Sequence, residues 1–125
     1  MQNNSSFSLK ARLRSFRYAF AGLFQLVCHE HNARIHAVAT VVVGIAGLLL
    51  HISRGDWQAI LMAIGLVWCT EACNTAIEKL SDRVSPEWNE QVRYIKDVAA
   101  AAVLMAAMVA VGIACLVFIP RLKML

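Results

Sequence analysis

Charged residues are scarce in this chain of 125 amino acids, at 16% of the total. Soluble domains carry about 25% charged and about 45–50% apolar residues, whereas 59% of this sequence is apolar. Proline and glycine are also few, with two and six residues, which excludes collagen-like and low-complexity chains. A chain of this length provides one domain, 1–125, and excludes a multidomain enzyme. The composition predicts a small integral membrane protein.

Several motifs of soluble enzymes and metal sites are also absent. The sequence has no GxxxxGK[ST] phosphate loop and no protein-kinase signature, so any kinase here is of another kind. The polar N-terminus has no apolar signal-peptide core, and we expect no cleaved leader. No CxxC pair occurs, so we expect buried free thiols rather than a disulfide or a metal site. The cysteines are Cys28, Cys69, Cys73 and Cys115.

Three long apolar segments are what the sequence does contain. A membrane-spanning helix needs about 20 mainly apolar residues, and we predict such helices over about 34–52, 57–83 and 86–119. The start of the third is indicated by Ser85-Pro86-Glu87, which combines a cap, a proline at the first helical position and an acid in the first turn. The fold class is therefore an all-α membrane protein with three transmembrane helices.

A fourth helix is predicted over about 7–28, because apolar residues recur there at steps of three and four. A helix packed on a soluble core would show the same pattern. The adjacent spans favour an amphipathic helix that lies in the membrane surface, with bases on its other side. The apolar positions are Leu9, Leu13, Phe16, Phe20, Leu23, Phe24 and Val27.

The basic residues are unevenly distributed around the predicted spans. Nine Lys and Arg precede the first span or separate the second from the third, and three lie on the other side. Basic loops stay cytoplasmic, so we expect the N-terminus and the segment 79–96 in the cytoplasm. Segment 79–96 would form a charged hairpin. The net charge of +4 is then a topology signal, and we expect no nucleic-acid partner.

Polar side chains at the end of the second span share one helical face. Glu71, Asn74, Glu78 and Asp82 are spaced at i, i+3, i+7 and i+11. If Trp57 marks the outer interface, Glu71 lies about 21 Å along the helix in an apolar core about 30 Å thick. An ionisable residue at this depth is costly and usually functional. The alternatives are that Glu71 only fixes helix packing and that Asp82 belongs to a solvated helix end.

This arrangement has the parts required for phosphoryl transfer to a lipid. A carboxylate just below the interface is placed to take a proton from a lipid hydroxyl. A carboxylate at the boundary could hold Mg²⁺ together with substrate phosphates, and a lysine can bind phosphate. Lys96-Asp97 directly precedes the third uncharged segment and is expected at the same level.

The segments Glu71-Ala-Cys-Asn74-Thr-Ala-Ile-Glu78 and Lys96-Asp97-Val-Ala-Ala resemble the small bacterial integral-membrane diacylglycerol kinase and undecaprenol kinase family. The similarity covers nearly the whole chain. It implies a homotrimer with active sites shared between protomers, which phosphorylates a membrane lipid alcohol from ATP at the cytoplasmic interface. Arg34-Ile-His36 is more similar to the undecaprenol kinases, and Asp82-Arg83-Val84 to the diacylglycerol kinases, so undecaprenol is favoured with diacylglycerol second.

The resemblance also implies roles for individual residues. Glu71 would be the general base, Glu30 and Glu78 would bind Mg²⁺, and Arg34 and His36 would contact the lipid substrate. The residues of the nucleotide site would be Tyr18, Asn74, Glu87, Lys96 and Asp97. Trp88-Asn89 departs from the Tyr-His of the diacylglycerol branch, which leaves open whether nucleotide contacts there differ.

Two other functions fit a small membrane protein with one embedded acid. In a proton-coupled transporter, Glu71 would carry the proton, but such sites usually lie near the midplane in broken helices. A non-catalytic membrane scaffold would leave the shared depth of Glu78 and Lys96-Asp97 unexplained. Nucleotide binding in detergent separates both from a kinase.

Overall fold

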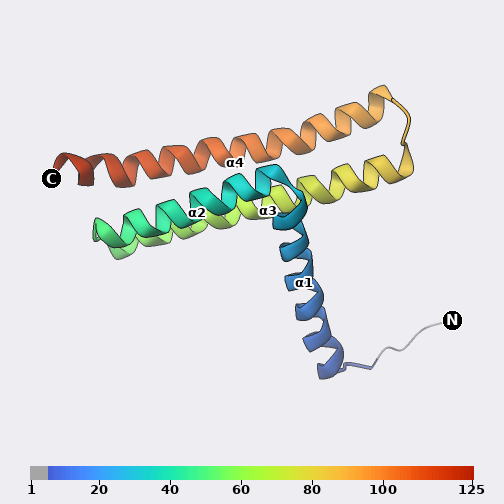
Figure 1. Cartoon of the computed structure of the whole chain (residues 1–125), viewed down its shortest axis with the longest axis horizontal. Helices are drawn as coiled ribbons and strands as arrows, with labels where there is room; N and C mark the ends of the chain where they lie inside the picture. Colours follow the sequence, from blue (N-terminus) through green and yellow to red (C-terminus); the bar gives the residue numbers. More distant parts are fainter. Residues whose placement is uncertain (1–5) are drawn as a thin grey trace.

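The computed structural model describes residues 6–125, which form four helices joined by short connections. The helices are α1 (Leu9–His29), α2 (His31–Leu49), α3 (Arg54–Val84) and α4 (Glu90–Lys123). The last three run side by side, whereas α1 lies crosswise to them and joins the N-terminal end of α2 (Figure 1). The all-helical class is as the sequence predicts.

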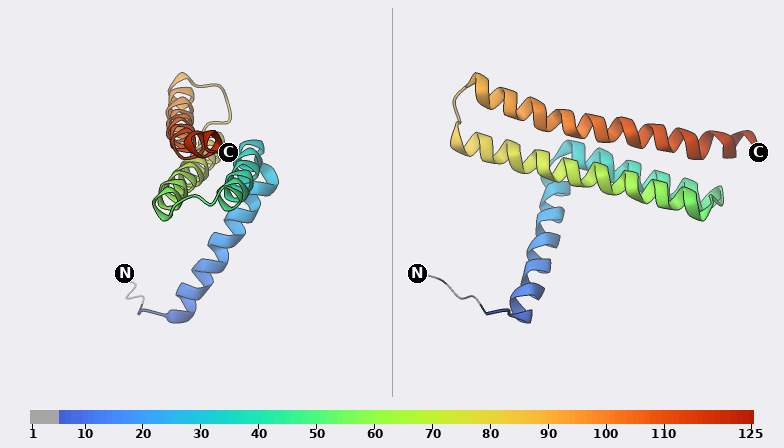
Figure 2. Two further views of the ribbon diagram at one scale, coloured as in Figure 1. Left: turned by 90° about the vertical axis from the view of Figure 1, so that its left-hand side faces the viewer. Right: turned by 180° about the vertical axis from the view of Figure 1, so that it is seen from behind.

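The three side-by-side helices are each long and apolar enough to cross a membrane. At 1.5 Å per residue, α2 is about 28 Å long, and α3 and α4 are about 46 Å and 51 Å. An apolar core about 30 Å thick therefore matches α2 and is shorter than the other two. The excess length of α3 and α4 extends past α1 at the end where they are connected, as both side views show (Figures 1 and 2).

The α1–α2 junction is one residue long. Glu30 is extended (φ −109°, ψ 123°), its N–H donates to the carbonyl of Leu26, and its carbonyl accepts from Arg34 N. Helix α1 therefore ends at Glu30 and α2 begins there. The start of α2 lies a few residues before the predicted start at about 34. At its other end α2 stops before His51, which has a left-handed φ of 48°.

Helix α3 begins with a complete capping box. The Ser53 hydroxyl accepts from Asp56 N at 3.1 Å, and the Asp56 carboxylate accepts from Ser53 N at 3.1 Å. This local pairing satisfies two backbone donors and starts the helix ahead of the predicted Trp57. The guanidinium of Arg121 in α4 lies 3.4 Å from the same carboxylate, so the cap also joins α3 to the end of α4.

Helix α4 begins later than the sequence predicts. Ser85 ends α3, since its N–H donates to the carbonyl of Ser81, and it is therefore not the cap of the next helix. Asn89 takes that role, because its Oδ1 accepts from the N–H groups of Gln91 and Val92 at 2.9 and 3.2 Å. The residues between Ser85 and Asn89 form the turn that connects the antiparallel helices α3 and α4. The predicted start of the helix at Pro86 is therefore wrong.

The apolar core is small and lies at the end of the bundle opposite the α3–α4 connection. Ile52, Ile60 and Val117 form its buried centre, with Trp57 packed against them. Elsewhere, large apolar side chains of α2 and α4 remain exposed. The four cysteines are free, as expected, but they are exposed rather than buried because the isolated chain leaves their helix faces uncovered.

Candidate active site

The polar face of α3 passes from buried to exposed along the helix. Glu71 is 2% exposed and Asn74 is 6% exposed, and they are the buried polar side chains of the described part of the chain. Glu78 is half-buried, and Asp82 is exposed. The face thus leads from the interior of the bundle to the end where α3 and α4 are connected.

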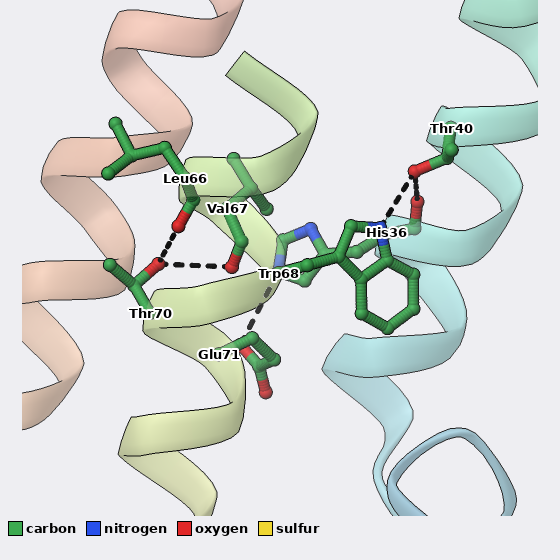
Figure 3. A network of polar contacts seen from close by, with 7 residues as sticks. All are labelled: His36, Thr40, Leu66, Val67, Trp68, Thr70 and Glu71. Atoms are coloured by element: carbon green, nitrogen blue, oxygen red, sulfur yellow. Dashed lines mark hydrogen bonds and ion pairs between the residues drawn. The ribbon is translucent and has the colours of Figure 1, made fainter. Parts of the chain in front are cut away.

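Glu71 faces His36 of α2. Its Oε2 lies 3.4 Å from Nε2 of His36, and a dashed line marks this contact in Figure 3. Neither Glu71 Oε2 nor Asn74 Oδ1 accepts a hydrogen bond from the residues that the structure describes. A buried acceptor without a donor costs about 1–3 kcal/mol, and such groups in native proteins call for a functional explanation.

A second polar contact joins the same two helices. The Thr40 hydroxyl donates to the carbonyl of His36 at 2.7 Å and accepts from Nε1 of Trp68 at 3.0 Å (Figure 3). Thr40 lies one turn beyond His36 on α2, and Trp68 lies one turn before Glu71 on α3. Two contacts therefore join this part of α2 to α3, one between His36 and Glu71 and one between Thr40 and Trp68.

Glu30 reaches α3 from the α1–α2 junction. Because its side chain does not cap α2, the carboxylate is available to pair with Nζ of Lys79 at 3.1 Å. Lys79 directly follows Glu78, so this ion pair brings Glu30 to the turn of α3 that carries Glu78. A groove of about 720 Å³ lies between α1 and α3, with Glu30 and Lys79 on its wall.

The ion pairs near the α3–α4 connection involve two predicted nucleotide residues. Lys96 of α4 binds the carboxylate of Asp82 on α3, so Asp82 is a bridge between helices rather than a merely solvated end. Asp97 is 72% exposed and lies 3.9 Å from Arg93 of its own helix. Only Lys96 of this pair therefore contacts α3.

Two further predicted nucleotide residues lie on exposed surfaces. Tyr18 is on α1 and is 66% exposed, and Glu87 is exposed in the connection between α3 and α4. Neither side chain makes a hydrogen bond or an ion pair within residues 6–125. The structure does not bring them to Glu71 within one chain.

Arg34 makes a contact that the sequence did not indicate. Its guanidinium donates to the carbonyl of Val27 at 3.0 Å and to that of Cys28. These carbonyls belong to the last turn of α1, where helices have no internal donors left. Arg34 thus ties the end of α1 to the start of α2.

The carboxylates of Glu30 and Glu78 are the predicted ligands for Mg²⁺. In the part of the chain that the structure describes, no three His, Cys, Asp or Glu side chains gather into a complete metal site. Mg²⁺ commonly takes one or two protein carboxylates and completes its shell with phosphates and water. The oxygen donors of Glu30 and Glu78 fit that incomplete type of site.

An apolar groove adjoins the buried carboxylate. It holds about 160 Å³ between α2 and α4, above the face of α3, and His36 lines it. Apart from Thr40, its other walls are small or branched apolar residues, among them Val43, Ala107 and Ala110. On the other side of His36 a second hollow is lined by Asn74 and Ala100. His36 therefore separates an apolar groove from a hollow with a polar wall.

Known proteins resemble this chain over most of its length. The family model for prokaryotic diacylglycerol kinase matches residues 17–118. The chain is 34% identical to an undecaprenol kinase of Bacillus subtilis over 109 residues, which cover 87% of this chain and 89% of that protein. It is 37% identical to a diacylglycerol kinase of Synechocystis over 90% of this chain and 66% of the relative. A diacylglycerol kinase of Escherichia coli K12 is 29% identical over 89% of this chain and 90% of that protein.

Proposed function

Because the chain belongs to the prokaryotic diacylglycerol kinase family and is a lipid kinase, we propose that it transfers the γ-phosphate of ATP to a membrane lipid alcohol. The reaction takes place at the cytoplasmic interface of the inner membrane. Undecaprenol is the favoured acceptor, and diacylglycerol is the second. The observation that carries the proposal is the buried carboxylate of Glu71, which contacts His36 where that residue lines both an apolar groove and a second hollow that contains Asn74.

Glu71 is the general base. It accepts the proton of the lipid hydroxyl while the alcohol oxygen forms a bond to the γ-phosphorus. The bond from that phosphorus to the bridging oxygen breaks, and ADP leaves with the electron pair. General-base catalysis of this kind contributes about 10²–10⁴-fold, and the remaining acceleration comes from positioning and charge neutralisation.

Glu30 and Glu78 would hold Mg²⁺, and the ion would neutralise phosphate charge when it is bound. Lys96 binds phosphate after release from Asp82, and Asn74 presents its amide to the same region. Tyr18, Glu87 and Asp97 complete the nucleotide site. Their exposure in the single chain supports a site that a neighbouring protomer completes.

The hydrocarbon chain of the substrate occupies the apolar groove between α2 and α4. Its hydroxyl must be at Glu71, and the groove begins at His36, which contacts that carboxylate. The occupant is therefore the tail of the acceptor lipid. The groove has a mostly apolar lining, as contact with a hydrocarbon chain requires.

The active form is a homotrimer with shared sites. Large apolar side chains of α2 and α4 are exposed in the single chain, and α4 has the consecutive small residues 99–102, which allow close helix approach.

Mixing Glu71→Gln and Asp97→Asn chains tests the sharing, because mixed trimers can contain an intact site only if the two residues come from different chains.

The amphipathic helix α1 lies in the cytoplasmic membrane surface, with the N-terminus and 79–96 in the cytoplasm. Its crosswise course and the extension of the α3–α4 hairpin past it (Figure 1) support this placement. The aromatic side chains of Phe16, Phe20 and Phe24 are exposed along α1, as a helix in contact with lipid requires.

Purified protein with MgATP and labelled phosphate tests the function. We expect label in an added C55 polyprenol, less in diacylglycerol, and none without lipid. Absence of transfer to both alcohols would contradict the proposal.

A further inference from the structure

Resting on the proposed function, we infer that His36 is a positioning residue that orients the Glu71 carboxylate for proton transfer, rather than a residue that binds lipid. The contact that carries this inference is the 3.4 Å approach of His36 Nε2 to Glu71 Oε2. Oε2 is buried and accepts no hydrogen bond from residues 6–125, so the contact with His36 is a close polar approach and not a formed hydrogen bond. The imidazole is thus the group in reach of that oxygen.

The α4 residues that line the hollows beside Asn74 offer no side-chain donor that could compete with His36. Where α4 lines the hollows beside Asn74, it presents alanine, valine and leucine side chains, including Ala100, Ala102 and Val103. Asn74 is itself unsatisfied at Oδ1. The orientation of the Glu71 carboxylate therefore depends on α2, and on His36 in particular.

The position of His36 is itself determined by packing. Its carbonyl accepts from Thr40, whose hydroxyl accepts from Trp68 of α3 (Figure 3). The ring is 17% exposed, so it is held between the apolar groove and the polar hollow. These bonds hold the backbone at His36 against α3, and a ring confined in this way can fix a neighbouring carboxylate in one orientation.

The chemical consequence concerns the two oxygens of Glu71. With Oε2 facing the imidazole, Oε1 is left to accept the proton of the lipid hydroxyl. The proton moves from the alcohol to Oε1 as the alcohol oxygen bonds to the γ-phosphorus, and His36 exchanges no proton with the substrate. Loss of such positioning costs about 10- to 100-fold in turnover when the reacting groups shift by about 1 Å.

The variants His36→Leu and His36→Gln separate positioning from lipid binding. Leucine removes the donor, whereas the glutamine amide keeps one. We expect His36→Leu to lower kcat about 10- to 100-fold with the KM for lipid and for MgATP within about twofold, and His36→Gln to recover most of the loss. Thr70→Val is the matched control, because the Thr70 hydroxyl bonds only to carbonyls of its own helix, Leu66 and Val67.

Three outcomes would overturn the inference. One is an unchanged kcat in His36→Leu, and another is a raised KM for lipid at constant kcat, which assigns His36 to lipid binding. The third is an equal loss in both variants with a lowered melting temperature, which assigns it to stability alone.

A measurement on ¹⁵N-histidine-labelled protein tests the contact without turnover. The Nε2 resonance of His36, identified by its loss in His36→Leu, should move in Glu71→Gln and stay in place in Thr70→Val. An unmoved resonance in Glu71→Gln would refute the contact. If the wild-type protein is inactive but Glu71→Gln still moves the resonance, the contact stands. The proposed function and the catalytic role of His36 would then be refuted.

Discussion

His36 of α2 and Glu71 of α3 face each other across the bundle, with Nε2 and Oε2 3.4 Å apart. A buried acid in a span is costly, and here its partner His36 lines both an apolar groove and a hollow that contains Asn74. A lipid kinase needs such a site, because its alcohol substrate stays in the bilayer and its nucleotide substrate stays in water.

With Glu30 as the proposed Mg²⁺ ligand, Lys79 should compete with the ion, since its Nζ lies 3.1 Å from the Glu30 carboxylate. Exposed ion pairs contribute about 0.2–1 kcal/mol, so Lys79→Met should lower the half-saturating Mg²⁺ concentration by up to about fivefold. Titration of kinase activity with Mg²⁺ at fixed ATP measures this. Lys123→Met, at the far end of α4, is the control, and an unchanged or higher Mg²⁺ requirement in Lys79→Met would count against Glu30 as a ligand.

Ala110→Leu should narrow the groove that we assign to the lipid chain. Overfilling a packed apolar space costs about 1–3 kcal/mol, which predicts a KM for the lipid raised about tenfold with an unchanged KM for MgATP. Steady-state kinetics in mixed micelles measure both constants. Val109→Leu adds volume at an exposed neighbour outside the groove, and it should behave as wild type. A lipid KM unaffected by Ala110→Leu would place the chain elsewhere.

Gly47 permits close packing of α2 against Trp57. A Cβ at Gly47 would lie 2.7 Å from Cη2 and 2.8 Å from Cζ2 of that indole, whereas one at Gly44 would meet nothing within 4 Å. Gly47→Ala should therefore destabilise the fold by about 1–3 kcal/mol. Gly44→Ala should be neutral or stabilising, because alanine favours a helix by about 0.5–1 kcal/mol over glycine. Unfolding in detergent compares the two, and equal stability would contradict the packing.

The sequence alone predicts the helices better than their contacts. The length of the three apolar segments predicts three membrane-spanning helices. The spacing of Glu71 and Asn74 predicts the buried polar face of α3. The start of α4 is mispredicted because Ser85-Pro86-Glu87 has a good local start signal, while Ser85 is already used to end α3. Local patterns cannot show which of two helices a residue serves.

The contacts between helices had no usable signal in the sequence. Thr40 with Trp68, and Glu30 with Lys79, come together only through the packing of α2 and the α1–α2 junction against α3. The family resemblance implies a lipid contact for His36, and the spacing of residues cannot reveal its partner Glu71 on α3. The exposure of the cysteines likewise depends on which helix faces the single chain leaves uncovered.

The most direct test of the account is turnover by Glu71→Gln, with nucleotide binding measured on the same preparation. Amide replaces carboxylate at almost constant volume, so we expect phosphate transfer to a C55 polyprenol to fall about 10²–10⁴-fold, with ATP affinity within about twofold. Glu90→Gln, an exposed acid in the first turn of α4, is the control and should retain activity. Wild-type turnover by Glu71→Gln would contradict the assignment of Glu71 as the base.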